Sequence, residues 1–215
     1  MPTDREVLWL AIPALGALIA EPLYVLGDTA IIGHLGTVPL AGLLLSEIFG
    51  FCTFLEYGTT ARAARLYGAG RVDEALDVGV QATWLALGLG VILVIGIEIV
   101  AVPAMHVMAG GNTAASVQAL RWMRIAALGA PFVLVTAAAQ GWMRALQDTR
   151  TPLVVIGLAN LASIALSATL VFGVGMGIRG SAIANVVAQA ASGLVFLVLL
   201  SRRGVSLRPS LERNG

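Results

Sequence analysis

Charge is scarce in this chain. Only 12% of its 215 residues are charged, and the formal net charge is +1. Soluble domains carry about 25% charged residues, which cover their surface. Hydrophobic residues make up 58% of the chain and the mean hydropathy is +0.90, which is more apolar surface than one soluble core of this size can hold. The composition excludes a soluble enzyme and a disordered chain, and the low net charge argues against binding of nucleic acid.

Cysteine and histidine are nearly absent. Cys52 is the single cysteine, which excludes an internal disulfide and any metal site built from cysteines. His34 and His106 are far apart in sequence and lack the spacing of metal ligands. No Walker loop, GxSxG or HExxH motif is present. We therefore expect no catalytic residue, no bound metal, no cofactor and no enzyme activity.

What the sequence has is long apolar runs. A membrane-spanning helix needs about 20 such residues, and six runs qualify: 7–33, 40–60, 78–102, 120–142, 153–172 and 181–200. The connectors are short, so consecutive helices should be antiparallel neighbours. The sequence predicts an all-α, polytopic membrane protein. Its six-transmembrane-helix bundle covers residues 1–201, and residues 202–215 form a cytoplasmic linker or tail.

The arginines predict the orientation, since all 13 basic residues are arginines. With both termini on one side of the membrane, the other side holds only Arg121, Arg124 and Arg179. The first side holds ten: Arg5, Arg62, Arg65, Arg71, Arg144, Arg150, Arg202, Arg203, Arg208 and Arg213. Basic residues favour the cytoplasmic side, so both termini should be cytoplasmic. All four tryptophans fall near predicted helix ends, where indoles favour the interface: Trp9, Trp84, Trp122 and Trp142.

The first predicted helix carries two carboxylates, Glu21 and Asp28. They are seven residues apart and share one helix face with Tyr24. Pro22 removes a backbone donor, which favours a bend beside these polar groups. Charged residues inside a bilayer tend to serve transport, so we interpret Asp28 and Glu21 as a protonatable or cation-binding site. For Glu21, an ion pair with an arginine at the membrane edge is the alternative.

The other intramembrane acids indicate helix ends. Glu56 is close in sequence to Arg62 and Arg65, which favours a charge-paired helix end. Glu47 and Glu98 fall near the outer ends of their helices. Solvation at the interface or snorkelling explains both better than contact with a substrate.

Two later helices each carry a polar stripe. Asn160, Ser163 and Ser167 follow helical spacing in the run 153–172. In the run 181–200 the stripe is Ser181, Asn185, Gln189 and Ser192. Either stripe can line a transport cavity or form hydrogen bonds between helices. As candidate cavity-lining residues we take Tyr24, Asn160, Ser163, Ser167, Asn185 and Gln189.

Four strings together resemble a known family. They are LAIPALGALIAEPLYVLGDTAIIGHLGTVPLAG, YGTTARAARLYGAGR, GWMRALQDTRTPL and GIRGSAIANVVAQ, in this order along nearly the whole chain. The chain resembles the multidrug and toxic compound extrusion (MATE) family, in its bacterial DinF-like branch. The resemblance implies the N-terminal lobe of a transporter that has twelve helices in two six-helix lobes, with substrate and coupling ion exchanged between the lobes.

The resemblance also implies residue roles. Asp28 matches the first-helix acid that the family uses for cation coupling, and Glu21 with Pro22 matches the EP of this branch. Many members have an asparagine in the fifth helix and an aspartate four residues later. Those positions here look like Ser163 and Ser167. The change removes a carboxylate and weakens the case for sodium, which prefers charged oxygen ligands.

The sequence thus predicts secondary efflux of small organic, cationic or amphipathic compounds, coupled to H⁺ or Na⁺. The expected partners are membrane lipid, a small-molecule substrate and a second six-helix lobe, and the expected location is the bacterial cytoplasmic (inner) membrane. Two alternatives stay open: a non-transporting truncated or partner membrane subunit, and a lipid-linked-sugar flippase of the same superfamily.

Overall fold

The computed structural model describes residues 53–108 and 113–203, together with six separate helical positions nearer the N-terminus: Leu15, Ile19, Leu23, Leu26, Gly27 and Ala30. The helices of the described part are α3 (Thr53–Gly68), α4 (Val72–Met108), α5 (Thr113–Ala127), α6 (Ala130–Ala145), α7 (Arg150–Ala168), the π-helix η2 (Thr169–Gly173) and α8 (Ile178–Ser201). No strand occurs in these residues. The predicted all-α class is confirmed.

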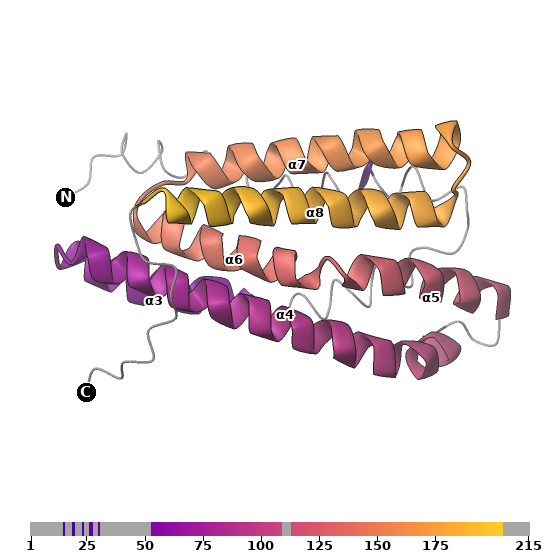
Figure 1. Cartoon of the computed structure of the whole chain (residues 1–215), viewed down its shortest axis with the longest axis horizontal. Helices are drawn as coiled ribbons and strands as arrows, with labels where there is room; N and C mark the ends of the chain where they lie inside the picture. Colours follow the sequence, from indigo (N-terminus) through magenta and orange to yellow (C-terminus); the bar gives the residue numbers. More distant parts are fainter. Residues whose placement is uncertain are drawn as a thin grey trace.

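A tight turn connects α3 to α4, because backbone hydrogen bonds cap the end of α3. At the end of α3, the N–H of Arg71 donates to the carbonyl of Leu66 at 3.0 Å and the N–H of Gly70 donates to that of Tyr67 at 2.9 Å. Gly70 has a φ of +76°, the left-handed conformation that this Schellman arrangement requires. The chain therefore reverses within a few residues, and α4 returns beside α3 (Figure 1).

The run 120–142 differs from the single helix that the sequence predicts. The structure has two helices there, α5 and α6, and their axes bend by 52° between Ala127 and Ala130. Gly129 and Pro131 explain the break, because proline lacks an N–H and cannot continue the hydrogen bonding of the preceding helix. Gly90 of α4 makes room for Pro131 at this break, because a Cβ on Gly90 would lie 2.3 Å from the Cα of Pro131.

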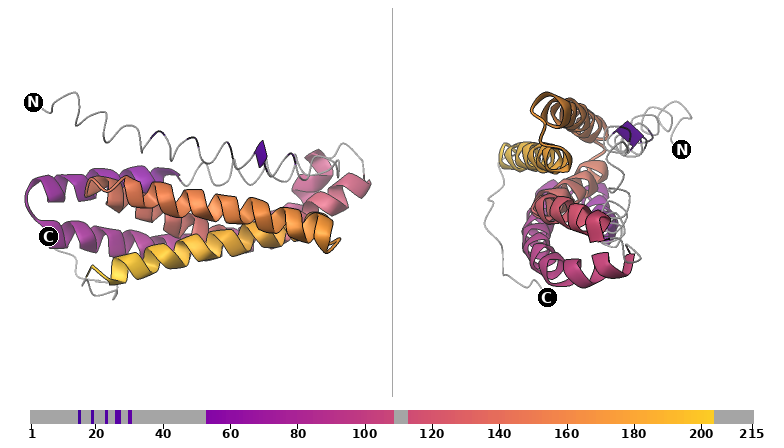
Figure 2. Two further views of the ribbon diagram at one scale, coloured as in Figure 1. Left: turned by 90° about the horizontal axis from the view of Figure 1, so that it is seen from above. Right: turned by 90° about the vertical axis from the view of Figure 1, so that its right-hand side faces the viewer.

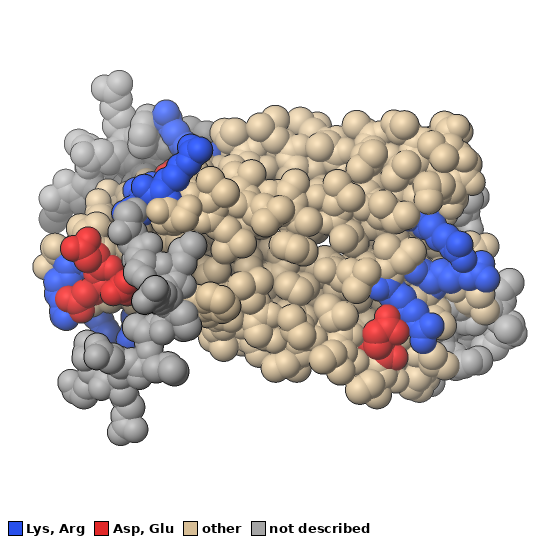
Figure 3. All heavy atoms as spheres, viewed as in Figure 1, with Lys and Arg blue, Asp and Glu red and all other residues tan. Residues whose placement is uncertain are grey.

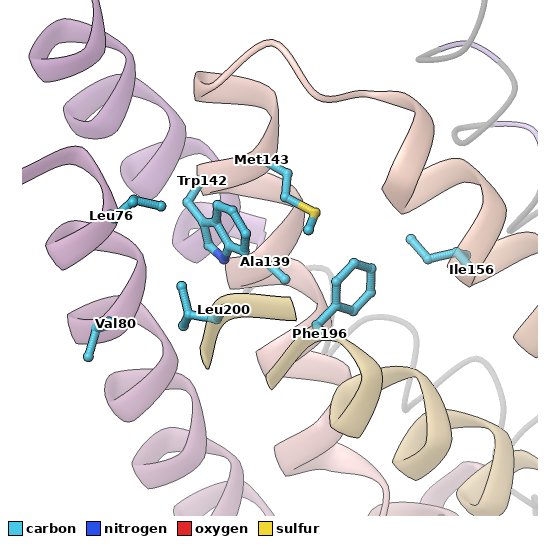
Figure 4. Packing of buried hydrophobic residues seen from close by; sticks show 8 residues of the cluster. All are labelled: Leu76, Val80, Ala139, Trp142, Met143, Ile156, Phe196 and Leu200. Carbon is cyan, nitrogen blue, oxygen red and sulfur yellow. The ribbon is translucent and has the colours of Figure 1, made fainter. Parts of the chain in front are cut away.

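α7 and α8 lie side by side as one pair, next to the group formed by α3, α4, α5 and α6 (Figures 1 and 2). A core cluster joins the two groups at one end of the bundle. Trp142, only 1% exposed, packs there over Gly79, where a Cβ would lie 2.9 Å from its ring. The remaining cluster members come from α4, α6, α7 and α8 (Figure 4): Leu76, Val80, Ala139, Met143, Ile156, Phe196 and Leu200. Trp142 is thus a core residue, and its predicted interfacial role is wrong.

Three described helices are long and apolar enough to cross a membrane, within Val72–Pro103, Arg150–Gly173 and Ile178–Ser201. The bent α5–α6 pair adds a fourth candidate if it counts as one span. Large apolar side chains point outward from these helices, among them Ile99 at 73% and Leu161 at 64% exposed. In Figure 3 the charged side chains gather at the two ends, and the middle of the visible face carries none. Such a surface suits lipid and not water.

Glu56 forms an ion pair with Arg144 of α6, and not with the predicted Arg62 or Arg65. The pair is mostly shielded: the side chains of Arg144 and Glu56 are 22% and 14% exposed. Arg144 also donates to the Oε1 of Gln140 at 3.2 Å. α3 and α6 approach each other closely beside this ion pair, since a Cβ on Gly141 would lie 2.7 Å from the backbone oxygen of Glu56. Charge pairing of this helix end is confirmed, with a partner from a distant part of the sequence.

Glu56→Gln should lower the stability of the bundle by about 2 kcal/mol, because a shielded guanidinium loses its charged acceptor. Adding Arg144→Gln should recover part of this loss, since no unpaired charge is then left. The fraction of detergent-solubilised protein that stays monodisperse after heating measures both effects. The control is Glu74→Gln, which breaks the exposed Arg71–Glu74 pair and should cost less than about 1 kcal/mol. Equal losses from Glu56→Gln and Glu74→Gln would contradict a structural role for the shielded pair.

Candidate functional site

Glu21, Tyr24 and Asp28, the predicted coupling residues and their neighbour, lie outside the described residues. The position just before Asp28 is described. A Cβ built on Gly27 would lie 2.9 Å from Cδ1 and 3.4 Å from Cγ1 of Ile164. The backbone at Gly27 therefore lies directly against α7.

The polar stripe of α7 is on the same face as this contact. Ile164 follows Asn160 by four residues and precedes Ser167 by three, so helical spacing places all three together. The stripe is buried: Asn160, Ser163 and Ser167 are 8%, 2% and 0% exposed. Each makes polar interactions in the structure. The described face offers one amide and two hydroxyl groups, which can donate and accept hydrogen bonds and supply neutral oxygen ligands.

Two members of the α8 stripe form hydrogen bonds between helices. Trp122 of α5 donates from Nε1 to Oγ of Ser181 at 3.4 Å. The hydroxyls of Thr136 on α6 and Ser192 lie 3.3 Å apart. Ser181 and Ser192 therefore link α8 to α5 and α6 by hydrogen bonds. This agrees with the interpretation of the stripe as a set of hydrogen bonds between helices.

Asn185 and Gln189 occupy the middle of the same stripe and are half-buried. Gln189 lies beside the break between α5 and α6, because a Cβ on Gly129 would be 3.7 Å from its Cβ. Interrupted helices inside membranes expose backbone carbonyls and often border binding sites. The sequence interpretation missed this break, although Gly129 with Pro131 two residues later was the signal for it.

The described part of the site contains no carboxylate. Glu56 forms an ion pair with Arg144. Glu98 forms an ion pair with Arg124 at 3.1 Å, and the side chains of these two residues are nearly half exposed. Glu47 lies outside the described residues. In the segments that the structure describes, no three His, Cys, Asp or Glu side chains come together as a metal site would require. What these segments offer is a buried hydrogen-bonding surface of neutral groups.

Apolar helices of membrane-spanning length, buried polar stripes between them and charge confined to the ends define a polytopic membrane protein. Within that class, the MatE family model matches residues 13–169, so the chain belongs to the MatE family. The resemblance to MATE transporters is confirmed.

Individual relatives support the assignment. DNA damage-inducible protein F of Escherichia coli is 33% identical over 214 residues, covering 95% of this chain and 46% of that protein. A Thermotoga maritima protein named "Probable multidrug resistance protein NorM" is 27% identical over 96% of this chain and 47% of its own length. The solved structure of a MOP superfamily transporter from Pyrococcus furiosus has a TM-score of 0.84 at 24% identity, over 94% of this chain and 46% of that one. The chain thus spans about half the length of these proteins, and its fold matches about half of the solved structure.

Proposed function

We propose that the chain is one lobe of a secondary transporter that exports small organic, cationic or amphipathic compounds in exchange for H⁺ or Na⁺. The observation that carries the proposal is the contact between Gly27 and Ile164. Gly27 directly precedes Asp28 in the sequence, and Ile164 lies on the α7 face that holds Asn160, Ser163 and Ser167. A titratable acid beside buried neutral oxygens is a suitable place to exchange a proton or a cation.

Several features support export as the activity. The chain belongs to the MatE family, and one relative carries multidrug resistance in its name. Coupling to an ion gradient requires no nucleotide site, and the sequence has no Walker motif. Without a carboxylate on the α7 stripe, a proton carried by Asp28 fits better than sodium, which prefers several charged oxygen ligands.

The proposal includes a second six-helix lobe, either in a longer polypeptide or in another chain. Its support is that the relatives named above are about twice as long as the aligned region. We expect the 215-residue chain alone to give no tolerance to a cationic dye in cells that lack their own efflux pumps. Joined to a second lobe, it should give tolerance. Robust tolerance from a demonstrated monomer of this chain would contradict the two-lobe requirement.

We further propose the bacterial inner membrane as the location, with both termini in the cytoplasm. The support is the ten-to-three bias of the arginines. Reporter fusions at residues 70 and 111 should report opposite sides of the membrane, with residue 70 cytoplasmic. A fusion at residue 203 serves as the control and should match residue 70. If residues 70 and 111 report the same side, this topology is wrong.

A further inference from the structure

Three arginines gather where α5 meets the start of α8. Arg121 and Arg124 are one turn apart on α5, and Arg179 is the second residue of α8. The hydrogen bond from Trp122 to Ser181 joins the two helices at this level. All three arginines are therefore within about one helical turn of a single interhelical contact. Figure 3 shows basic side chains grouped over this end of the molecule.

The arginine group carries excess positive charge. Glu98 pairs with Arg124 at 3.1 Å. The other described acids, Glu56, Asp73, Glu74, Asp77 and Asp148, belong to the opposite end of the bundle. Three arginines with one described glutamate leave a net charge of +2. All three arginine side chains are exposed, so they are accessible to an anion from outside the bundle.

Arg179 occupies an unfavourable position unless an anion is nearby. It lies in the first turn of α8, where the helix dipole is positive and repels a cation. No acidic residue is present in that turn, and the N-cap residue is a glycine, Gly177, which has no side chain to cap the helix. An anion placed there would be attracted by the helix N-terminus and by the guanidinium groups together.

Exposed apolar side chains flank the arginine group. Phe172 and Val174 are each 63% exposed and precede Arg179, while Leu128, at 54%, lies one turn after Arg124 on the side toward the membrane centre. A free inorganic anion gains nothing from contact with these apolar side chains, whereas the acyl chains of a lipid would bury them. We propose that Arg121, Arg124 and Arg179 bind the phosphate of an anionic phospholipid, such as phosphatidylglycerol, at the membrane surface. This site does not depend on the proposed transport activity.

Photo-crosslinking tests the proposal. The protein is reconstituted into vesicles of equimolar phosphatidylglycerol and phosphatidylcholine, with a trace of either lipid carrying a diazirine. We expect the phosphatidylglycerol probe to label peptides covering residues 113–124 and 170–181 more strongly than the phosphatidylcholine probe. Each basic residue near a membrane surface contributes about fivefold to anionic-lipid binding, so Arg179→Gln should reduce this preference about fivefold. The pair Arg121→Gln and Arg179→Gln should reduce it about 25-fold.

The matched control is the pair Arg62→Gln and Arg65→Gln on α3, which removes two exposed arginines at the opposite end. It should leave the labelling of these two peptides unchanged. Two results would overturn the proposal: equal labelling by both probes, or unchanged preference in both Arg179 variants.

Discussion

Asp28→Asn is expected to reduce export to the level of cells without the transporter. Asparagine keeps the size of the side chain and its capacity for hydrogen bonds but removes the titratable charge. If Asp28 alone carries the exchanged proton or cation, no other acid at the described α7 face can replace it, because Asn160, Ser163 and Ser167 are neutral. Growth of a pump-deficient strain on a cationic dye measures the effect, in a complete transporter that carries this lobe.

Three further variants define the specificity of this result. Glu21→Gln should reduce tolerance less, because its predicted position nearer the cytoplasmic half allows partial solvation. Ser163→Ala and Ser167→Ala should each have a modest effect, since a hydroxyl contributes a ligand but no charge. Protein amounts in the membrane must match the wild type for all four. Wild-type tolerance with Asp28→Asn would remove Asp28 from the mechanism.

Gly90→Ala should be among the most destabilising small substitutions in the described part of the chain. The new Cβ would lie 2.3 Å from the Cα of Pro131 and 2.7 Å from its backbone nitrogen. Backbone atoms cannot rotate aside, so α4 and α6 must separate at the break. We expect a loss of about 3 kcal/mol, the upper range for overpacking. Retention of monodisperse protein after heating in detergent measures it.

Gly88 and Gly96 supply the controls on the same helix. A Cβ at either position meets nothing within 4 Å. Alanine there should be neutral or stabilising by up to about 1 kcal/mol, because alanine favours the helix more than glycine does. Equal destabilisation by all three substitutions would show that the close packing of α4 on Pro131 does not hold the bend together.

Much of the fold could be predicted from the sequence because the length of an apolar run is a local property. The runs 78–102, 153–172 and 181–200 fall inside α4, α7 with η2, and α8. The helical spacing of Asn160, Ser163 and Ser167 also placed them on one face before any contact was known. What each face packs against is not local, and the proximity of Ile164 to Gly27 followed only from the structure.

The features that the sequence did not reveal depend on contacts between distant segments. Glu56 has two arginines within nine residues, yet its partner is Arg144, 88 positions away, because α3 and α6 pack closely at Gly141. Trp142 was expected at the interface, but the missing side chain of Gly79 makes room for its ring in the core. The bend after Ala127 depends likewise on Gly90, about 40 residues earlier in the chain.

Transport by purified protein in proteoliposomes tests the proposed antiport most directly. A complete transporter carrying this lobe would be reconstituted with a fluorescent organic cation inside, and a pH gradient or a sodium gradient would be imposed separately. We predict that at least one inward ion gradient drives release of the cation, with the pH gradient the more effective, and that Asp28→Asn abolishes this release. Release at the same rate without any gradient, or no release under either gradient from correctly folded protein, would contradict ion-coupled export.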